Sequence, residues 1–186
     1  MEQATPKKDL IYLAGFMGSG KSTIGPILAN TLGYDFLDLD RVIEGKTSKR
    51  IADIFSESGE QAFRVIERNT LKEVSILHRC VVSLGGGTIA NDENFQLIRE
   101  SGVIIYLQLS PEEILKRVHF KTDRPMLKDG QGGKLQKEGM RERIQELLQR
   151  REEFYRQADI LVKTDQVKVG TTVDEIVHKL RGLIEF

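Results

Sequence analysis

The segment Gly15-Phe16-Met17-Gly18-Ser19-Gly20-Lys21-Ser22 decides the fold, because it fits the phosphate-loop pattern G-x-x-x-x-G-K-[ST] at every constrained position. The glycines of such a loop let backbone N–H groups converge on phosphate oxygens, and the lysine places a cation on the β- and γ-phosphates. The closing hydroxyl is a ligand for Mg²⁺. We therefore expect Lys21 to act in catalysis, Ser22 to bind the metal, and nucleotide binding to involve Gly15, Gly18, Ser19, Gly20, Lys21, Ser22 and Thr23.

The flanking sequence has the context that a phosphate loop requires, a strand before it and a helix after it. Residues 10–14 form a short apolar run typical of a buried parallel strand. Apolar residues then recur at helical intervals over residues 22–32, and Gly33 ends the pattern. The alternative, a glycine-rich turn with an incidental lysine, is disfavoured by this context.

Strand and helix patterns alternate along the rest of the chain. We expect further strands at residues 34–38, 79–84, 103–109 and 160–162. Helical patterns cover residues 48–58, 60–77, 138–156 and 172–183, and Pro111 opens another helix at a first-turn position. The sequence therefore predicts an α/β fold in three layers, with a five-stranded parallel sheet between helices. At 186 residues we expect a single domain over residues 1–186.

The composition limits the partners of the protein. Lys plus Arg and Asp plus Glu each number 28, so no overall field attracts nucleic acid or an anionic membrane. The single cysteine, Cys80, cannot form an internal disulfide and lies in an apolar run, where it fits a small core residue. The polar start of the chain has no signal-peptide pattern, and the longest apolar stretch is too short to span a bilayer. We expect a cytoplasmic monomer with no nucleic-acid or membrane partner.

One polar segment interrupts the alternation, at residues 118–138. It carries five basic residues and three glycines and has little apolar periodicity. In a phosphate-loop protein, a basic insertion of this kind is a candidate lid that closes over the phosphates and excludes water. A solvated surface loop is the alternative.

Two carboxylates follow the second predicted strand, at Asp38 and Asp40. This edge of an open α/β sheet carries ligands, and residues two apart in a strand face the same side. One carboxylate could hold metal-bound water and the other could take the proton of an acceptor hydroxyl. The alternative for Asp40 is a helix N-cap, because a short helix could follow at residues 41–44.

The other motifs favour a small-molecule kinase among phosphate-loop proteins. The third predicted strand ends in Ser83-Leu84-Gly85-Gly86-Gly87 and lacks the acidic pair that motor and transport ATPases place there. The chain also has no Asn-Lys dipeptide, so the N-K-x-D segment of guanine-specific switch proteins is absent.

In its ordered motifs the sequence resembles the shikimate kinase family. That family combines the phosphate loop with a D-x-D, an E-x-x-F-R-x-x-E segment, a G-G-G turn and an R-P in the lid. The matching segments follow in the same order, at Gly15 to Ser22, Asp38 and Asp40, Glu60 to Glu67, Gly85 to Gly87, and Arg124-Pro125. The resemblance implies a fold like that of nucleoside monophosphate kinases, with a lid at residues 118–138 and an acceptor-binding region at residues 40–77. It implies ATP and shikimate as substrates, Mg²⁺ as cofactor, and phosphorylation of the shikimate 3-hydroxyl on the route to chorismate and the aromatic amino acids.

The resemblance also implies roles around the transferred phosphoryl group. Asp40 would bind the ring hydroxyls and serve as base or orienter for the attacking hydroxyl, and Asp38 would lie in the magnesium shell. Arg124 would contact the nucleotide and the transferring phosphate as a catalytic residue. Arg117 would lie along the adenine.

In the acceptor site, the resemblance implies that Arg64 and Arg151 bind the substrate carboxylate, with Arg64 held in place by Glu67. Gly86 and Gly87 would let the backbone approach the ring, because glycine has no Cβ. Here the chain departs from the family's R-x-P-L-Y segment, since it reads Arg151-Glu152-Glu153-Phe154-Tyr155. The adjacent Arg150 is therefore an alternative to Arg151.

Two other functions compete with shikimate phosphorylation. One is another metabolite kinase, for gluconate or a nucleoside monophosphate; gluconate also carries a carboxylate, so the arginines alone do not exclude it. The other is a catalytically silent nucleotide-binding module, against which the presence of Lys21, Ser22, Asp40 and Arg124 argues.

Overall fold

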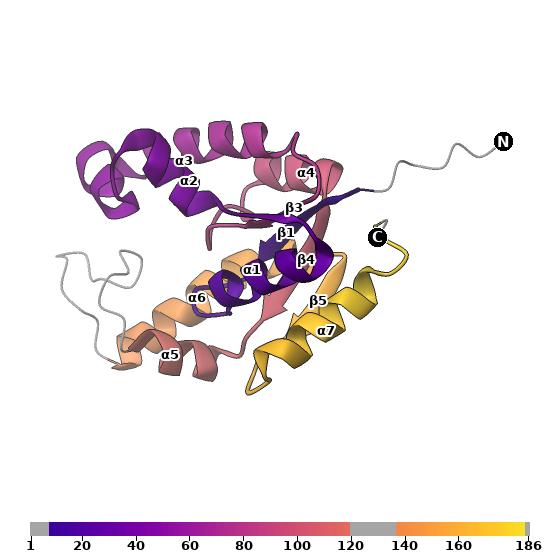
Figure 1. Cartoon of the computed structure of the whole chain (residues 1–186). Helices are drawn as coiled ribbons and strands as arrows, with labels where there is room; N and C mark the ends of the chain where they lie inside the picture. Colours follow the sequence, from indigo (N-terminus) through magenta and orange to yellow (C-terminus); the bar gives the residue numbers. More distant parts are fainter. Residues whose placement is uncertain (1–7, 120–136, 185–186) are drawn as a thin grey trace.

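A computed structural model describes residues 8–119 and 137–184 of the chain. The elements follow in the order β1 (Leu10–Ala14), α1 (Lys21–Leu32), β2 (Asp35–Asp38), α2 (Leu39–Thr47), α3 (Ile51–Val74), β3 (Cys80–Ser83), α4 (Asp92–Ser101), β4 (Val103–Gln108), α5 (Pro111–His119), α6 (Lys137–Arg156), β5 (Ile160–Lys163) and α7 (Val169–Leu180). The five strands lie where the sequence predicted them, and helices separate them (Figure 1).

The strands form one parallel sheet in the order β2-β3-β1-β4-β5. In the register, Leu13 of β1 pairs with Ser83 of β3, and Asp38 at the end of β2 also pairs with Ser83. The strands therefore end together. The phosphate loop, the Asp38–Asp40 segment and the glycine turn after β3 all leave the sheet at this carboxyl edge, where open α/β sheets bind ligands.

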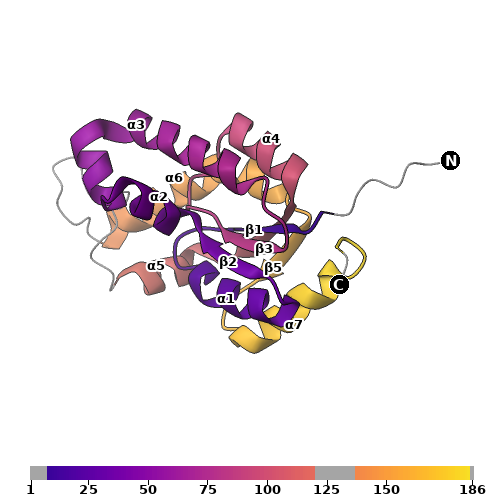
Figure 2. The ribbon, with the colours of Figure 1, turned by 45° about the horizontal axis from the view of Figure 1, so that its top comes forward.

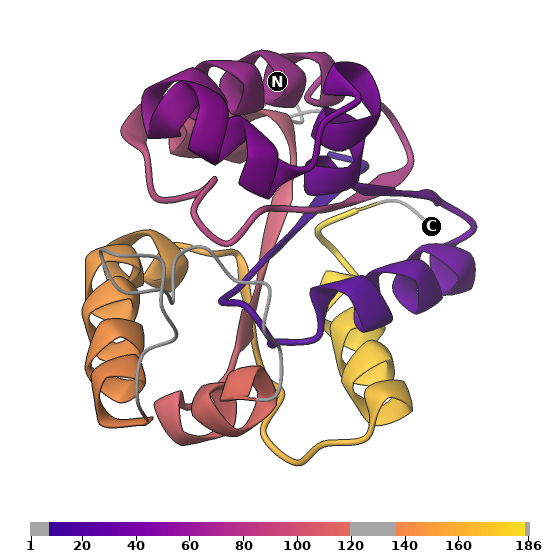
Figure 3. The same ribbon diagram turned by 90° about the vertical axis from the view of Figure 1, so that its left-hand side faces the viewer.

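Helices cover both faces of the sheet, as Figure 2 shows. Helices α3 and α4 pack on one face against alternate strand residues such as Tyr12 and Val82. On the other face, α1 and α7 lie side by side (Figure 3) over Ile11, Leu13 and Val81. Both faces of the central strands β1, β3 and β4 are thus buried, which explains why these strands are almost continuously apolar, whereas the edge strands β2 and β5 are partly exposed and carry charged residues. The expected three-layer α/β fold is confirmed.

A third apolar cluster connects the phosphate loop to α5 and α6. Phe16, at the second position of the loop, is buried with Ile114 and Val118 of α5 and with Met140 and Ile144 of α6. The two helices therefore pack directly against the phosphate loop.

The helices between β2 and β4 differ from the sequence prediction. Helix α2 spans Leu39–Thr47, where the sequence suggested at most a short helix at residues 41–44. By contrast, the division predicted between helices at 48–58 and 60–77 is confirmed, because α3 consists of two helical parts separated at Gly59 by a non-helical backbone (φ 79°, ψ 173°). Helix α4 was not predicted, although Asn91 is an N-cap whose side chain accepts a hydrogen bond from Asn94 N.

Cys80 lies inside β3 and is buried, and burial raises the pKa of its thiol to about 11. A thiol with a raised pKa is a poor nucleophile, so Cys80 is the small core residue that its apolar context predicts. Over residues 8–119 and 137–184, no helix combines the length and the apolar character needed to cross a membrane.

Candidate active site

The phosphate loop wraps around the N-terminus of α1. A Cβ on Gly15 would lie 2.7 Å from the carbonyl oxygen of Leu107 and 2.6 Å from Oγ of Ser19, so only glycine fits there. Gly20 caps α1 in the left-handed conformation, with φ 102°. The first turn of α1 contains no acidic residue, which leaves the positive end of the helix dipole for an anion.

Lys21 is folded back over this loop. Its Nζ donates to the carbonyl oxygens of Gly15 and Phe16 at 2.7 and 3.2 Å. The cation is therefore fixed above the loop backbone, at the position where a phosphate on the N-terminus of α1 would meet it.

A cavity of about 560 Å³ opens in front of the loop, a size typical of small-ligand sites. The predicted nucleotide-binding residues that line it are Gly18, Ser19, Gly20, Lys21, Ser22, Thr23 and Arg117. Its far wall comes from the segment after β5 and from α7, with Thr164, Val167, Val169 and Thr172. The cavity therefore extends from the phosphate loop to a wall of valines and threonines, where a base could lie.

Arg117 of α5 connects the two sides of this cavity. Its Nη1 donates to the carbonyl oxygen of Gly18 and its Nη2 to that of Thr164, each at 3.0 Å. A planar guanidinium held at both ends offers a flat cationic surface to an aromatic ring. The structure thus brings Arg117 to the nucleotide cavity.

Asp38 and Asp40 line the same cavity, as expected. They do not do so as two residues of one strand, however, because only Asp38 belongs to β2. Asp38 is the last residue of β2 and the N-cap of α2, and its carboxylate accepts a hydrogen bond from Arg41 N at 3.3 Å. Asp40 lies in the first turn of α2. The helix cap that the sequence offered as an alternative role for Asp40 therefore belongs to Asp38, and the turn of the helix directs both residues to the cavity.

Burial raises the pKa of Asp40 from 3.8 to about 6. The nearby carboxylates of Asp38 and Glu67 contribute to this rise, while the ammonium of Lys21 opposes it. A carboxylate with such a pKa remains ionised at neutral pH and is a better proton acceptor than an ordinary aspartate. Asp40 has the properties of a general base.

A second, smaller cavity of about 130 Å³ adjoins the first. Its lining includes Asp40, Arg64, Gly86, Gly87 and Arg151, which are the five predicted acceptor-binding residues. The rings of Phe55 and Phe63, 4.7 Å apart, form an apolar side. Met17, Asp40 and Gly86 line both cavities, so the two spaces meet at the Asp40 carboxylate.

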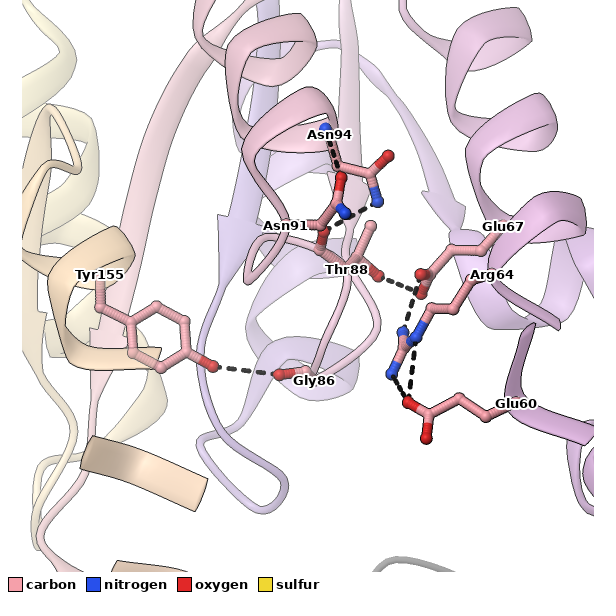
Figure 4. Close-up of polar contacts among 8 residues, drawn as sticks. All are labelled: Glu60, Arg64, Glu67, Gly86, Thr88, Asn91, Asn94 and Tyr155. Carbon is pink, nitrogen blue, oxygen red and sulfur yellow. Dashed lines mark hydrogen bonds and ion pairs between the residues drawn. The ribbon is translucent and has the colours of Figure 1, made fainter. Parts of the chain in front are cut away.

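The guanidinium of Arg64 is held between two carboxylates (Figure 4). Nη1 donates to Oε2 of Glu67 at 2.8 Å, and Nε and Nη2 donate to Oε1 of Glu60 at 3.3 and 3.0 Å. Glu67 is 1% exposed and also accepts a hydrogen bond from Thr88 Oγ1 at 2.7 Å. Although burial tends to lower the pKa of Arg64, the two carboxylates raise it overall.

Arg151 of α6 approaches the glycine turn from the other side. It is 4% exposed, its guanidinium lies 5.2 Å from the ring centre of Phe16, and burial lowers its pKa. Four residues on, the hydroxyl of Tyr155 donates to the carbonyl oxygen of Gly86 at 3.2 Å (Figure 4). Arg150, the sequence alternative, pairs with Glu146 and has a side chain 69% exposed, so Arg151 is the arginine that the structure brings to the cavity.

A Cβ on Gly87 would lie 3.1 Å from Nη2 of Arg64 and 3.6 Å from Nη2 of Arg151. The two guanidinium groups therefore converge on this glycine from α3 and α6. Two forked cations around one point form a site for a planar carboxylate, which they can bind through paired N–H groups.

The residues that would hold Mg²⁺ are Ser22 and Asp38, which both line the larger cavity. Within residues 8–119 and 137–184, no group of three or more His, Cys, Asp or Glu side chains could hold a metal alone. Such an arrangement fits Mg²⁺, which proteins commonly bind through one or two carboxylates plus the phosphates of the substrate.

One predicted catalytic residue, Arg124, lies outside the described residues, as does most of the predicted lid at 118–138. Conversely, the structure adds residues to which the sequence analysis gave no role. Glu60 and Thr88 contact the Arg64 system, and Thr164 and Val167 line the nucleotide cavity. Only Glu60 had a signal in the sequence, since it lies one helical turn before Arg64.

Comparisons with known proteins agree with this geometry. A family model described as shikimate kinase matches residues 17–181. The shikimate kinase of Chlorobaculum tepidum is 52% identical over 171 residues, which cover 92% of this chain and 90% of the relative. That of Chlorobaculum parvum is 50% identical over 171 residues, which cover 92% of this chain and 91% of the relative. A solved shikimate kinase from Acinetobacter baumannii in complex with shikimate has a TM-score of 0.85 at 32% identity, covering 94% of this chain and 93% of that one. A gluconokinase from Sinorhizobium meliloti has a TM-score of 0.61 at 18% identity over 95% of this chain and 94% of that one, which shows a common fold alone.

Proposed function

The chain belongs to the shikimate kinase family, and we propose that it transfers the γ-phosphoryl group of ATP to the 3-hydroxyl of shikimate. The products are shikimate 3-phosphate and ADP, in the biosynthesis of chorismate and the aromatic amino acids. One observation carries this proposal: a phosphate-loop cavity and a small cavity with two arginines meet at the carboxylate of Asp40.

The nucleotide occupies the larger cavity in this proposal. Its phosphates lie on the loop and the N-terminus of α1, and Lys21 and the lid residue Arg124 contact the transferring phosphoryl group. Ser22 and Asp38 hold Mg²⁺, which supplies charge neutralisation at the β- and γ-phosphate oxygens. The contacts of Arg117 with Gly18 and Thr164 support its place along the adenine.

The acceptor occupies the smaller cavity, with its carboxylate between Arg64 and Arg151 near Gly87. Its ring then lies along Gly86 and against the side chain of Phe55. The residues around it come from the predicted acceptor-binding region at 40–77, from the glycine turn and from Arg151. A planar carboxylate matches two forked guanidinium groups, and a cavity of about 130 Å³ suits a small acceptor. This placement brings an acceptor hydroxyl to the junction of the two cavities.

Asp40 takes the proton of the attacking hydroxyl. Its position at the junction and its pKa of about 6 support this role, because an ionised base near neutral pH is needed there. Catalysis is otherwise positioning and electrostatic stabilisation of charge on the transferred group. One arginine aimed at that charge contributes on the order of 10³-fold in such enzymes, and we assign that role to Arg124.

We also propose that the protein acts as a cytoplasmic monomer on small molecules, within one kinase domain. Equal numbers of acidic and basic residues support the absence of a nucleic-acid partner. Of the rival functions, gluconate phosphorylation shares a carboxylate acceptor with the proposal, but the gluconokinase similarity is one of fold, at 18% identity. A silent module is disfavoured because a base, a phosphate loop and a carboxylate site are all assembled.

The test is a coupled assay of ADP release with Mg-ATP, comparing shikimate with gluconate, a nucleoside monophosphate and no acceptor. The Lys21→Ala protein serves as the blank. Turnover that requires both shikimate and Lys21 supports the proposal. Turnover with another acceptor only would refute the acceptor assignment, and no turnover with any acceptor would favour the silent module.

A further inference from the structure

The buried residue Thr88 connects the glycine turn to the arginine of the acceptor site. It is 0% exposed and follows Gly85, Gly86 and Gly87 directly. Its hydroxyl donates to Oε1 of Glu67 at 2.7 Å, and the other oxygen of that carboxylate accepts from Arg64. A chain of two hydrogen bonds therefore runs from the turn to the guanidinium, as Figure 4 shows.

The direction of the Arg64 guanidinium depends on this chain. Glu60 accepts from Nε and Nη2, and Glu67 accepts from Nη1. Each Nη of an arginine carries two N–H bonds, so each has one more N–H than these bonds to the described residues use. A Cβ on Gly87 would lie 3.1 Å from Nη2 and 3.3 Å from Nη1, so the open end of the guanidinium faces the turn.

The two carboxylates that hold Arg64 differ in how firmly they are held themselves. The side chain of Glu60 is 62% exposed, and exposed ion pairs of this kind contribute little. Glu67 is 1% exposed, and the Thr88 hydroxyl accounts for its second oxygen. A buried carboxylate that loses a hydrogen-bond donor must find another partner or move. The Thr88 hydroxyl therefore fixes the position of Glu67. Glu67 in turn holds Arg64 more firmly than the exposed Glu60 does.

Thr88 is itself held on both sides. Its backbone N–H donates to the carbonyl oxygen of Gly85 at 3.2 Å, and its own carbonyl oxygen accepts from Nδ2 of Asn94 at 3.0 Å. Asn94 lies in the first turn of α4, whose N-cap Asn91 accepts from Asn94 N at 3.0 Å. The hydroxyl therefore projects from a rigid segment and has a fixed direction.

We propose that Thr88 is a positioning residue of the acceptor site, and that its hydroxyl, acting through Glu67, holds the open end of the Arg64 guanidinium toward Gly87, where the acceptor carboxylate binds. This inference rests on the proposed function and deepens it, because it names a residue that touches neither substrate yet sets the affinity for one of them.

The test compares Thr88→Val, which keeps the shape and removes the hydroxyl, with Thr88→Ser, which keeps the hydroxyl. We expect Thr88→Val to raise KM for shikimate about tenfold while KM for ATP and kcat at saturating shikimate change less than about twofold, because one hydrogen bond to a charged group is lost. Thr88→Ser should restore KM for shikimate. Thr70→Val is the matched control, a buried threonine of α3 that lines neither cavity, and should leave both KM values unchanged.

An unchanged KM for shikimate in Thr88→Val, or an equal defect in Thr88→Ser, would overturn the proposal. Equal losses for shikimate and ATP would also overturn it, since they indicate a general structural role. If Thr88→Val does not fold, Thr88→Ala against Thr88→Ser carries the same comparison. A crystal structure of the hydroxyl-free variant separates this proposal from the function: Arg64 turned away from Gly87 supports it, and an unmoved Arg64 refutes it, even if the wild type does not phosphorylate shikimate.

Discussion

Replacing the proposed base, Asp40→Asn, should make the protein inactive and more stable at the same time. In the unfolded chain the carboxyl ionises near its ordinary pKa of 3.8, whereas in the folded chain it keeps its proton up to about pH 6. Between these pH values the folded protein retains a proton that the unfolded chain has lost, so stability falls as the pH rises. Above pH 6 the whole penalty is present. Asparagine has a similar shape and cannot ionise, so it carries no such penalty.

The size of the effect follows from the difference between the two pKa values, which corresponds to about 3 kcal/mol. Because Asp40 is partly exposed, solvent screening reduces this value, and we expect Asp40→Asn to be more stable by about 2 kcal/mol at pH 8. A gain of that size raises the melting temperature by about 4–8 °C in a chain of this length. Turnover with shikimate should fall by on the order of 10²–10⁴-fold, the usual contribution of a general base.

Urea unfolding at pH 4.5, 6 and 8 measures the stability difference directly. The advantage of Asp40→Asn should grow mainly between pH 4.5 and 6 and change little from pH 6 to 8, since the wild type loses stability between the two pKa values and the variant does not. Asp174→Asn in α7 makes the same change at an exposed position and should stay within about 0.5 kcal/mol of the wild type. An advantage that is absent at pH 8, or that does not depend on pH, would refute a raised pKa at Asp40.

Three further changes test the acceptor site and the metal. Gly87→Ala places a Cβ 3.1 Å from Nη2 of Arg64, so we expect KM for shikimate to rise about tenfold or more at constant KM for ATP. As a control, the Cβ of Gly45→Ala in α2 meets no atom within 4 Å, so this variant should change neither KM. Equal KM values for shikimate in the two variants would argue against a crowded glycine turn. Arg151→Ala should raise KM for shikimate by about 10–100-fold through the loss of a charge-assisted hydrogen bond. Arg150→Ala should have the wild-type KM in the same steady-state assay. A raised KM in Arg150→Ala and an unchanged KM in Arg151→Ala would instead assign the carboxylate site to Arg150. Removal of divalent cations with EDTA should abolish ADP release, and excess Mg²⁺ should restore it; activity that persists in EDTA would contradict a metal role for Ser22 and Asp38.

The sequence could predict the phosphate loop and the sheet because both depend on local patterns. Each position from Gly15 to Ser22 is constrained by the phosphate-binding backbone, and the central strands β1, β3 and β4 are almost continuously apolar because both of their faces are buried. Helix α4 escaped prediction since its buried face is narrow, with Phe95 and Ile98 on a short, polar segment. The length of α2 was underestimated because the capping role was considered for Asp40 and not for Asp38.

The acceptor site could be predicted from the sequence only in part. Arg64 and Glu67 share a helix face at a spacing of three residues, so a pattern could relate them. The bond from Thr88 to Glu67 joins residues 21 positions apart and depends on how the turn after β3 packs against α3. The convergence of Arg64 and Arg151 on Gly87 likewise arises from tertiary packing, and from the sequence it followed only through the family resemblance.

The wall that Met17, Asp40 and Gly86 contribute to both cavities makes the two binding equilibria thermodynamically dependent on each other. If the binding of one substrate rearranges this wall, the affinity of the other cavity for its substrate changes. The factor must be the same in both directions, because linkage between two ligands is reciprocal. A dissociation constant measured for one substrate alone therefore describes a wall beside an empty second cavity, which is not the state that the second substrate meets during turnover.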